Sequence, residues 1–396
     1  MRIAIWLDIA EWGGVDDHVR TMLSKWNTGD QLILFTNAND TILSRLVDVE
    51  TVGNRVVVVR LVNPLFRHTR LRRYLEIFLL PLFVQSCFYL AKRVLKRNGP
   101  FDALLIENGG YPGSWSSISV AKAAGRLGII HRAMIVCHKA IKPQILRQTI
   151  ESYFDRKVQK WVTRFVCISQ ATRQSLFENR GFDSQKIQAS VVYCGVANED
   201  CIGHTHKYLR DLLRLGDDKV LVGMLGRLSR YKGHSELLAA VSQLPLEIRS
   251  RIEVIFIGGS NAADVNRLEK IAELLGIADF VHFCGYVEQS PYCIISELDL
   301  LVSATQDFEG FGLTIGQAMS VGTAVIATDV GAVSEFCDSS CAYLVKPGHL
   351  DLLTDSICLA LTDERSTKMK IANAHMKILD YSPQKMSSEI RFNLFR

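Results

Sequence analysis

The sequence has no long apolar run at its start. The opening stretch MRIAIWLD holds only five consecutive apolar residues before Asp8, whereas a secretory signal needs an apolar core of about 7–15 residues. A run of this length suits a first buried strand better. We therefore expect no secretory signal and a cytoplasmic location.

Closely spaced cysteine pairs are also missing. The ten cysteines are scattered, and no Cys-x-x-Cys pair occurs among them, although that spacing is typical of zinc sites and redox motifs. Cys137, Cys167 and Cys284 lie in apolar stretches, where a thiol packs as a small hydrophobic group. We expect neither a disulfide nor a zinc site.

Charge is distributed unevenly along the chain, which carries a net charge of +5. Residues 1–195 hold 27 Lys and Arg against 15 Asp and Glu, a net of +12, and residues 196–396 hold 19 against 26, a net of −7. A basic half predicts contact with an anionic surface. The sequence lacks the aromatic-and-basic motifs of nucleic-acid binding, so we expect an anionic membrane or a phosphate-linked lipid and no nucleic acid.

Short apolar strands alternate with helical stretches, which is the pattern of a parallel sheet covered by helices on both faces. At 396 residues the chain is too long for one compact core, and the pattern restarts after a linker near residues 196–206. The sequence therefore predicts an α/β fold with two Rossmann-like doubly wound domains, at residues 1–195 and 203–378. The expected strands are 2–7, 31–36, 55–62, 103–108, 133–138, 164–169 and 190–196 in the first domain, and 219–226, 253–259, 280–287, 298–304, 324–329 and 342–347 in the second.

One segment of the first domain differs from the rest. A mostly apolar run covers residues 76–91, with Pro81 and Gln85 inside it, and is too short for a membrane span of about 20 residues. Basic residues flank it on both sides, which predicts an interfacial element on anionic headgroups. The alternative is a core helix with solvated basic ends. The flanking residues are Arg67, Arg70, Arg72, Arg73, Lys92, Arg93, Lys96 and Arg97.

The stretch from Thr305 to Glu335 organises the second domain. It follows an apolar strand, passes an acidic loop with Glu309 and the glycines Gly310 and Gly312, and continues into a helix predicted from about Leu313 to Ser320. Backbone N–H groups and the helix dipole at such a helix start form an anion site beyond the carboxyl end of the strand. Phosphate is the expected ligand.

A basic turn, GRLSRYKGH at 226–234, follows the first strand of the second domain. Arg227 and Lys232 lie five positions apart across this turn, so both could reach a diphosphate. Their charges would stabilise a nucleoside diphosphate as it departs, because negative charge develops there. The alternative is a pair of solvated basic residues.

Together these motifs resemble the donor signature of the retaining nucleotide-sugar glycosyltransferases of GT-B type, family 4 (group 1). The resemblance covers nearly all of the second domain and is patchy in the first. It implies the GT-B fold, with the two domains facing a cleft and a C-terminal helix at 379–396 crossing back to the first domain. The family has two glutamates eight positions apart; Glu309 matches the first, and Gln317 stands in place of the second.

The resemblance also implies roles for single residues. Glu309 would contact hydroxyls of the transferred sugar, and Gln317 would meet the nucleotide ribose, which an amide can do as donor and acceptor. His138, at the end of a first-domain strand, would approach the reacting sugar. The catalytic residues implied are Glu309, His138, Arg227 and Lys232, and the donor-binding residues are Gly13, Gly14, Arg227, Lys232, Gly285, Tyr286, Glu309, Gly310, Phe311, Gly312, Leu313 and Gln317.

No Asp-x-Asp pair occurs in the sequence, although the other large class of nucleotide-sugar transferases holds its metal on such a pair. We expect metal-independent chemistry and no cofactor. The predicted activity is retaining transfer of a sugar from a nucleoside diphosphate sugar to a lipid-linked saccharide, in surface polysaccharide or lipopolysaccharide synthesis at the cytoplasmic face of the membrane. A soluble small-molecule acceptor is the alternative to the lipid-linked one. A nucleotide-sugar epimerase of the same fold and an inactive partner subunit are the alternatives.

Overall fold

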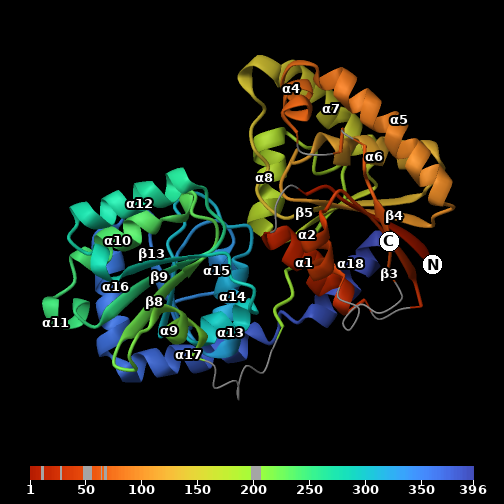
Figure 1. Cartoon of the computed structure of the whole chain (residues 1–396). Coiled ribbons are helices and arrows are strands. Elements are labelled where there is room, and N and C mark those ends of the chain that lie inside the picture. The colour runs from red at the N-terminus through yellow and green to blue at the C-terminus, as the bar shows by residue number, and fades with distance from the viewer. Residues whose placement is uncertain (10–12, 27–28, 48–55, 64, 67–68, 198–206) are drawn as a thin grey trace. The chain divides into compact units, whose positions relative to one another are not determined.

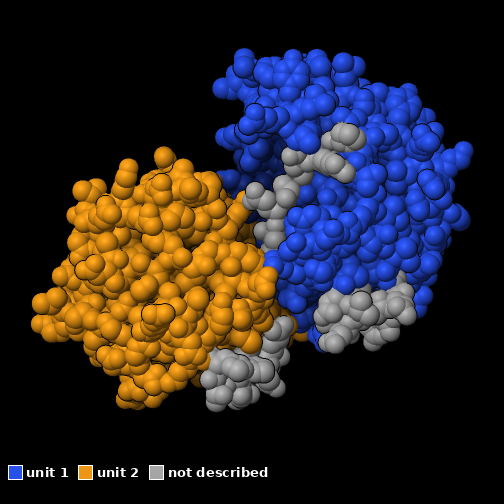
Figure 2. All heavy atoms as spheres, in the orientation of Figure 1, with its two compact units in different colours: residues 1–195, 383–396 blue, residues 196–382 orange. Residues whose placement is uncertain are grey.

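A computed structural model of the chain describes residues 1–9, 13–26, 29–47, 56–63, 65–66, 69–197 and 207–396. The chain divides into two compact units, each with its own sheet (Figures 1 and 2). Unit 1 comprises Met1–Gly195 together with Pro383–Arg396, and unit 2 comprises Val196–Ser382.

Unit 1 is built on a parallel sheet whose strand order is β3-β2-β1-β4-β5-β6-β7. The central strand β1 is buried along nearly its whole length, as expected for a parallel sheet that is covered on both faces. The order reverses between β1 and β4, so their carboxyl ends flank a switch point. The strands are β1 (Arg2–Leu7), β2 (Gln31–Thr36), β3 (Val56–Arg60), β4 (Ala103–Asn108), β5 (His131–Val136), β6 (Arg164–Cys167) and β7 (Ala189–Val191).

Helices cover both faces of the unit 1 sheet. One face packs on α5, α6 and α7 in a core that includes Phe83, Ile118 and Phe154. The other face carries α1 and α18, which are joined where the Ser387 hydroxyl donates to the Met22 carbonyl at 2.8 Å. The helices are α1 (Gly14–Ser24), α2 (Asp40–Leu46), α4 (Arg70–Phe78), α5 (Leu80–Asn98), α6 (Trp115–Arg126), the 3-10 turn η2 (Ile145–Arg147), α7 (Gln148–Trp161), α8 (Gln170–Arg180) and α18 (Pro383–Phe395).

Unit 2 repeats this design with the strand order β10-β9-β8-β11-β12-β13. Every pairing is parallel, and the order reverses between β8 and β11. In open α/β sheets, ligands bind outside the carboxyl ends of the strands at such a reversal. The strands are β8 (Val220–Leu225), β9 (Ile252–Ile257), β10 (Val281–Gly285), β11 (Leu300–Ser303), β12 (Ala324–Thr328) and β13 (Tyr343–Val345).

The helices of unit 2 also form two layers (Figure 1). Contacts join α10 with α12 and α16 in one layer, and α13, α14 and α17 in the other. The core of the first layer includes Leu237, Phe256 and Ile357. The helices are α9 (Tyr208–Leu213), the turn η3 (Arg230–Lys232), α10 (His234–Ser242), α11 (Leu246–Arg249), α12 (Ala262–Leu274), the turn η4 (Ala278–Phe280), α13 (Pro291–Ser296), α14 (Leu313–Val321), α15 (Val333–Phe336), α16 (Leu350–Thr362) and α17 (Glu364–Ile378).

The predicted α/β architecture of two doubly wound parallel sheets is confirmed. Ser169 caps α8, because its hydroxyl accepts the Thr172 N–H at 3.1 Å. Helix α1 begins at Gly14, directly after Gly13. The Gly13 N–H donates to the Asp16 carboxylate at 2.7 Å, and this reciprocal contact at the helix start draws the first turn towards the glycine pair.

The apolar segment 76–91 forms the end of α4 and the first part of α5. No single helix among the described residues is long and apolar enough to cross a membrane; α4 and α5 pass such a test only as a pair bent by 120°. One face of α5 is core, with Phe83, Val84 and Cys87 buried. Other apolar side chains, including Phe78 and Leu82, are exposed. The buried face of α5 agrees with the core-helix alternative, and contact with anionic headgroups stays a prediction.

The expectation that Arg72 is a solvated basic flank is wrong. Its side chain is 2% exposed, and its guanidinium donates two hydrogen bonds to the Asp8 carboxylate at 2.7 and 3.0 Å. Burial alone would make a charged arginine costly, but a bidentate carboxylate compensates for the lost hydration. Arg70 and Arg73 are exposed, whereas Arg67 lies outside the described residues.

Candidate functional site

The carboxyl ends of β8 and β11 bring Lys232 and Glu309 together in unit 2. Lys232 ends the turn η3 after β8, and Glu309 lies in the loop after β11. The Lys232 Nζ lies 2.7 Å from the Glu309 Oε2, with the side chains 24% and 15% exposed. The two predicted site residues therefore form an ion pair, partly open to solvent, at the switch point of the sheet.

Close backbone packing holds Lys232 in place. The next residue, Gly233, begins α10 with a φ of 85°, and a Cβ there would lie 1.9 Å from the Ala304 carbonyl oxygen. The Gln306 N–H also donates to the Tyr231 carbonyl at 2.7 Å. The basic turn is thus fixed directly to the end of β11, and only glycine fits at the contact.

Glu309 is fixed from its other side. The Thr305 hydroxyl donates to the Glu309 Oε2 at 3.1 Å, and the Ala332 N–H donates to the Glu309 carbonyl at 2.9 Å. Gly331 has a φ of 61°, and a Cβ added to it would lie 2.2 Å from the Glu309 carbonyl oxygen. Both the side chain and the backbone of Glu309 are therefore positioned by neighbouring loops.

The predicted anion site at the start of α14 is present as backbone geometry. Gly312, with a φ of 97°, is the residue before the helix, so the first N–H groups of α14 have no partner within the helix and can face an anion. The Phe311 side chain is buried against Phe336, with ring centroids 4.5 Å apart. Phe311 therefore anchors the loop, and only its backbone can meet a ligand. Gln317 lies in the second turn of α14 and is buried.

Arg227 and the end of β10 complete this edge of unit 2. Arg227 is exposed and forms no hydrogen bond or ion pair through its side chain with the residues that the structure describes. Gly285 ends β10 with a φ of 64°, and its carbonyl accepts the Gly258 N–H at 2.7 Å. Tyr286 follows it and is about half exposed, so both of these predicted donor-binding residues lie at the carboxyl end of a strand of the same sheet.

His234, which follows Gly233, is a buried neighbour of the basic turn. Its ring packs edge-on against Phe256, with centroids 5.0 Å apart. Loss of hydration lowers the pKa of His234 to about 4, and the charges of Arg267 and Lys232 act in the same direction. His234 is therefore neutral near pH 7, which leaves Arg227, Arg230 and Lys232 as the cations of the turn.

In unit 1, the predicted residues gather at the carboxyl edge of its own sheet. Gly13 and Gly14 start α1 after β1, and His138 follows β5 and is half-buried. Gly110, beyond β4, lies next to His138, because a Cβ on Gly110 would lie 3.6 Å from the His138 Cβ. The segment after His138 is held by the Ala140 N–H, which donates to the Ser175 hydroxyl at 2.7 Å.

The structure thus brings the predicted residues together in two groups, one in each unit. The sequence reading missed the residues that support Glu309 and Lys232, namely Thr305, Gly233, Gly331 and His234. Gly233 and Gly331 could have been suspected, because each glycine lies in a loop that follows a strand. Their partners, however, are 71 and 22 positions away in sequence, so the reason for the glycines appears only in the fold.

Comparison with known proteins identifies the second domain. Residues 208–377 match the family Glycosyl transferases group 1. This range contains Arg227, Lys232, Glu309 and the whole of α14.

Curated relatives match over part of their lengths. A D-inositol 3-phosphate glycosyltransferase of Corynebacterium jeikeium is 32% identical over 133 residues, covering 33% of this chain and 32% of the relative. The O-antigen biosynthesis glycosyltransferase WclY of Escherichia coli is 22% identical over 152 residues, covering 38% of this chain and 40% of the relative. The chain therefore spans less than half the length of these relatives.

Solved structures share the complete fold. HepE of Anabaena in complex with UDP and glucose has a TM-score of 0.74 and 18% identity, covering 100% of this chain and 99% of that one. WaaG, a glycosyltransferase involved in lipopolysaccharide biosynthesis, has a TM-score of 0.71 and 15% identity, covering 98% of both chains. The architecture is GT-B.

The contact between Gly331 and Glu309 predicts a stability difference between two glycine variants. Gly331→Ala and Gly348→Ala both place a side chain at positive φ, which costs about 1–2 kcal/mol. Only Gly331→Ala meets a close neighbour, since nothing lies within 4 Å of a Cβ at Gly348. We expect Gly331→Ala to lower the free energy of unfolding of unit 2 by about 1–3 kcal/mol more than Gly348→Ala, measured by urea denaturation; equal losses would contradict the contact.

His234 predicts a pH dependence of stability. The pKa of His234 falls from an ordinary value near 6.5 in the unfolded chain to about 4 in the fold. The contribution of this pKa difference to the free energy of unfolding is therefore fully present above pH 6.5. It is lost as the pH falls towards 4, by at most about 3 kcal/mol. Denaturation of the wild type and His234→Gln at pH 7.5 and 4.5 should give a smaller pH-dependent loss for the variant. If the wild type and the variant lost the same free energy of unfolding between these pH values, protonation of His234 would not destabilise the fold.

Proposed function

From the match of residues 208–377 to the group 1 glycosyl transferase family, we propose that this chain is a retaining glycosyltransferase. It moves a sugar from a nucleoside diphosphate sugar to an acceptor hydroxyl. The acceptor is a lipid-linked saccharide of surface polysaccharide or lipopolysaccharide synthesis. This proposal rests most of all on Lys232 and Glu309 at the switch point of the unit 2 sheet.

The donor diphosphate binds at the basic turn and the start of α14. Arg227 has an exposed side chain available for a phosphate, and Lys232 carries three N–H donors, of which Glu309 occupies one. Both cations follow β8, while the N–H groups of α14 follow β11. Charge that develops on the leaving diphosphate is therefore stabilised by two side-chain cations and a helix start.

Glu309 binds the transferred sugar. Its Oε2 already accepts from Lys232 and Thr305, which fixes the carboxylate orientation and leaves Oε1 to accept from a sugar hydroxyl. Gln317 binds the ribose, and Gly285 and Tyr286 contact the nucleobase. His138, which follows β5 of unit 1, would contact the reacting sugar, and the glycine loop of Gly13 and Gly14 follows β1 of the same sheet.

Transfer proceeds with retention by front-side substitution. The bond between the anomeric carbon and the diphosphate oxygen breaks while the acceptor oxygen bonds to the same face of that carbon. The leaving phosphate oxygen takes the acceptor's proton, so no side chain has to act as nucleophile. Because Arg227 and Lys232 supply the positive charge, the departure of the diphosphate is metal-independent.

The comparisons support a nucleotide-sugar donor and a saccharide acceptor. HepE is solved with UDP-glucose, at 18% identity and a TM-score of 0.74. The relative WclY is named for O-antigen biosynthesis, and WaaG for lipopolysaccharide biosynthesis. These names agree with the acceptor class that the charge distribution of the chain favours.

Unit 1 has an apolar surface suited to a membrane that carries such an acceptor. Two neighbouring elements form this apolar surface, α4 with the start of α5, and the turn η2. They are joined where the Arg147 guanidinium donates to the Glu76 carbonyl at 2.5 Å. The exposed members of the apolar surface are Leu71, Tyr74, Ile77, Phe78, Leu79, Leu82, Ile145 and Leu146.

Exposed cations accompany this apolar surface. Arg70 and Arg73 lie on α4, Lys142 precedes η2, and Arg156 lies on α7. Apolar side chains that enter the headgroup region and cations that meet anionic lipid act together in peripheral binding. We therefore place the protein at the cytoplasmic face of a membrane.

Two alternatives to the proposed transfer are an inactive partner subunit and a nucleotide-sugar epimerase. Gln317 replaces the glutamate of the resembling family, so an inactive partner subunit would keep the fold and lose turnover. A nucleotide-sugar epimerase would instead convert the donor with no acceptor present. Both alternatives therefore predict no transfer of sugar to an acceptor.

Product analysis tests the proposed transfer. The protein is incubated with a panel of nucleotide sugars and bacterial lipid extract, and release of nucleoside diphosphate and the anomeric configuration of the product are measured. We expect acceptor-dependent release with retention. Lys232→Ala should lower kcat by about 10²–10³, because it removes one preorganised charge from the transition state.

Control variants separate this result from the alternatives. Lys270→Ala removes an exposed lysine of unit 2 and should leave kcat unchanged. Conversion of the donor without acceptor would identify an epimerase. No turnover with any donor, together with activity gained by Gln317→Glu, would identify an inactive subunit.

Vesicle sedimentation tests the apolar surface. Ile145 and Leu146 are 90% and 98% exposed, so the double variant Ile145→Ser/Leu146→Ser should fold normally. Each apolar side chain that leaves water contributes about 1.5–3 kcal/mol, and we expect at least about tenfold weaker binding to vesicles that contain anionic lipid.

Leu274 provides the matched control for this measurement. It is 87% exposed on α12 of unit 2, and Leu274→Ser should bind vesicles as the wild type does. Equal binding by all three proteins, or binding that does not depend on anionic lipid, would refute membrane contact through this surface.

A further inference from the structure

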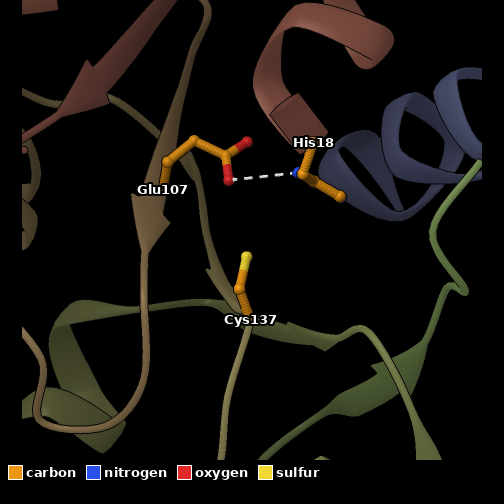
Figure 3. Close-up of side chains that lie close together, drawn as sticks. All are labelled: His18, Glu107 and Cys137. Carbon is orange, nitrogen blue, oxygen red and sulfur yellow. Dashed lines mark ion pairs between the residues drawn. The ribbon is translucent and has the colours of Figure 1, made fainter. Parts of the chain in front are cut away.

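Three potential metal ligands meet inside unit 1. His18 lies on α1, Glu107 on β4, and Cys137 directly follows β5. One ligand atom from each side chain lies within 4.8 Å of the others, and the three side chains point towards a common space (Figure 3). They are 2%, 1% and 9% exposed, respectively.

The nitrogen and oxygen atoms of this cluster lack hydrogen bonds. Neither ring nitrogen of His18 and neither carboxylate oxygen of Glu107 has a hydrogen-bond partner among the described residues. The His18 Nδ1 lies 3.7 Å from the Glu107 Oε2. Buried polar groups are normally paired with protein, water or a metal, so this arrangement points to a ligand.

We propose that His18, Glu107 and Cys137 bind a divalent metal ion of the zinc class. Nitrogen, carboxylate oxygen and thiolate are the ligands that Zn²⁺ takes in proteins, and tetrahedral coordination places ligand atoms about 3.3–3.8 Å apart. The distance of 3.7 Å between His18 and Glu107 already matches this spacing. The remaining separations need to shorten by at most about 1 Å, which a small side-chain rotation provides.

The ion would be structural. It would join the first turns of α1, beside Gly13 and Gly14, to the carboxyl ends of β4 and β5, and Cys137 directly precedes His138. This role is separate from the departure of the diphosphate in unit 2 and does not rest on the proposed function. It departs from the sequence-based expectation of no zinc site, which rested on the lack of Cys-x-x-Cys pairs and on the apolar surroundings of thiols such as Cys137.

Metal binding by the whole protein tests the proposal. The purified chain is stripped with a chelator, dialysed, and titrated with Zn²⁺ and with Co²⁺, whose absorption reports thiolate coordination. We expect one equivalent of either ion to bind, a thiolate-to-cobalt charge-transfer band, and a higher Tm with Zn²⁺.

Two cysteine variants decide whether the band arises at this site. Cys137→Ala should abolish the band and lower the affinity at least tenfold, whereas Cys87→Ala, which removes another buried thiol of unit 1, should change neither. His18→Asn provides a second ligand variant and should also lower the affinity. Binding of less than a tenth of an equivalent by the wild type, or a band that persists in Cys137→Ala, would overturn the proposal.

Discussion

The candidate site of unit 2 depends on the ion pair between Lys232 and Glu309, which are 77 positions apart in sequence. Parallel strands end at the same edge of a sheet, and reversal of the strand order between β8 and β11 leaves their two loops adjacent. The basic turn and the acidic loop must therefore meet. Gly233 and Gly331 remove the side chains that would separate them. The ion pair is partly exposed and is held in place by both loops. Lys232 and Glu309 can therefore each turn from one another to bind a charged ligand.

In unit 1, a second ion pair connects the apolar surface to the carboxyl edge of the sheet. Asp8 directly follows β1, and Arg72 of α4 binds it bidentately. Ser114, before α6, also donates to the Asp8 carboxylate, at 2.5 Å. Because this pair is buried, breaking it would leave an uncompensated charge. The helix that carries the exposed apolar residues is thus anchored at the edge where Gly13 and His138 lie. The proposed membrane contact and the acceptor side of the proposed reaction therefore belong to one unit.

Much of this arrangement could be predicted from the sequence, since buried parallel strands appear as continuous apolar runs and glycines mark the loops between strands and helices. The strands and the start of α14 at Leu313 were predictable for that reason. The burial of Arg72 was not, because its partner Asp8 lies 64 positions away and a basic cluster gives no sign of which member turns inward. The cluster of His18, Glu107 and Cys137 was missed for a similar reason: its members come from three elements, without the fixed spacing of a local metal motif.

The central claim is that unit 2 recognises the diphosphate of an activated sugar through Arg227 and Lys232. Calorimetric titration of the wild type with a nucleoside diphosphate and with the matching nucleoside measures this recognition directly. The account predicts that the diphosphate binds much more tightly than the nucleoside, and that Arg227→Ala and Lys232→Ala each weaken the diphosphate at least about tenfold, as expected for a lost charged hydrogen bond. Equal affinities for the two ligands across a panel of bases, or affinities unchanged by both substitutions, would contradict it.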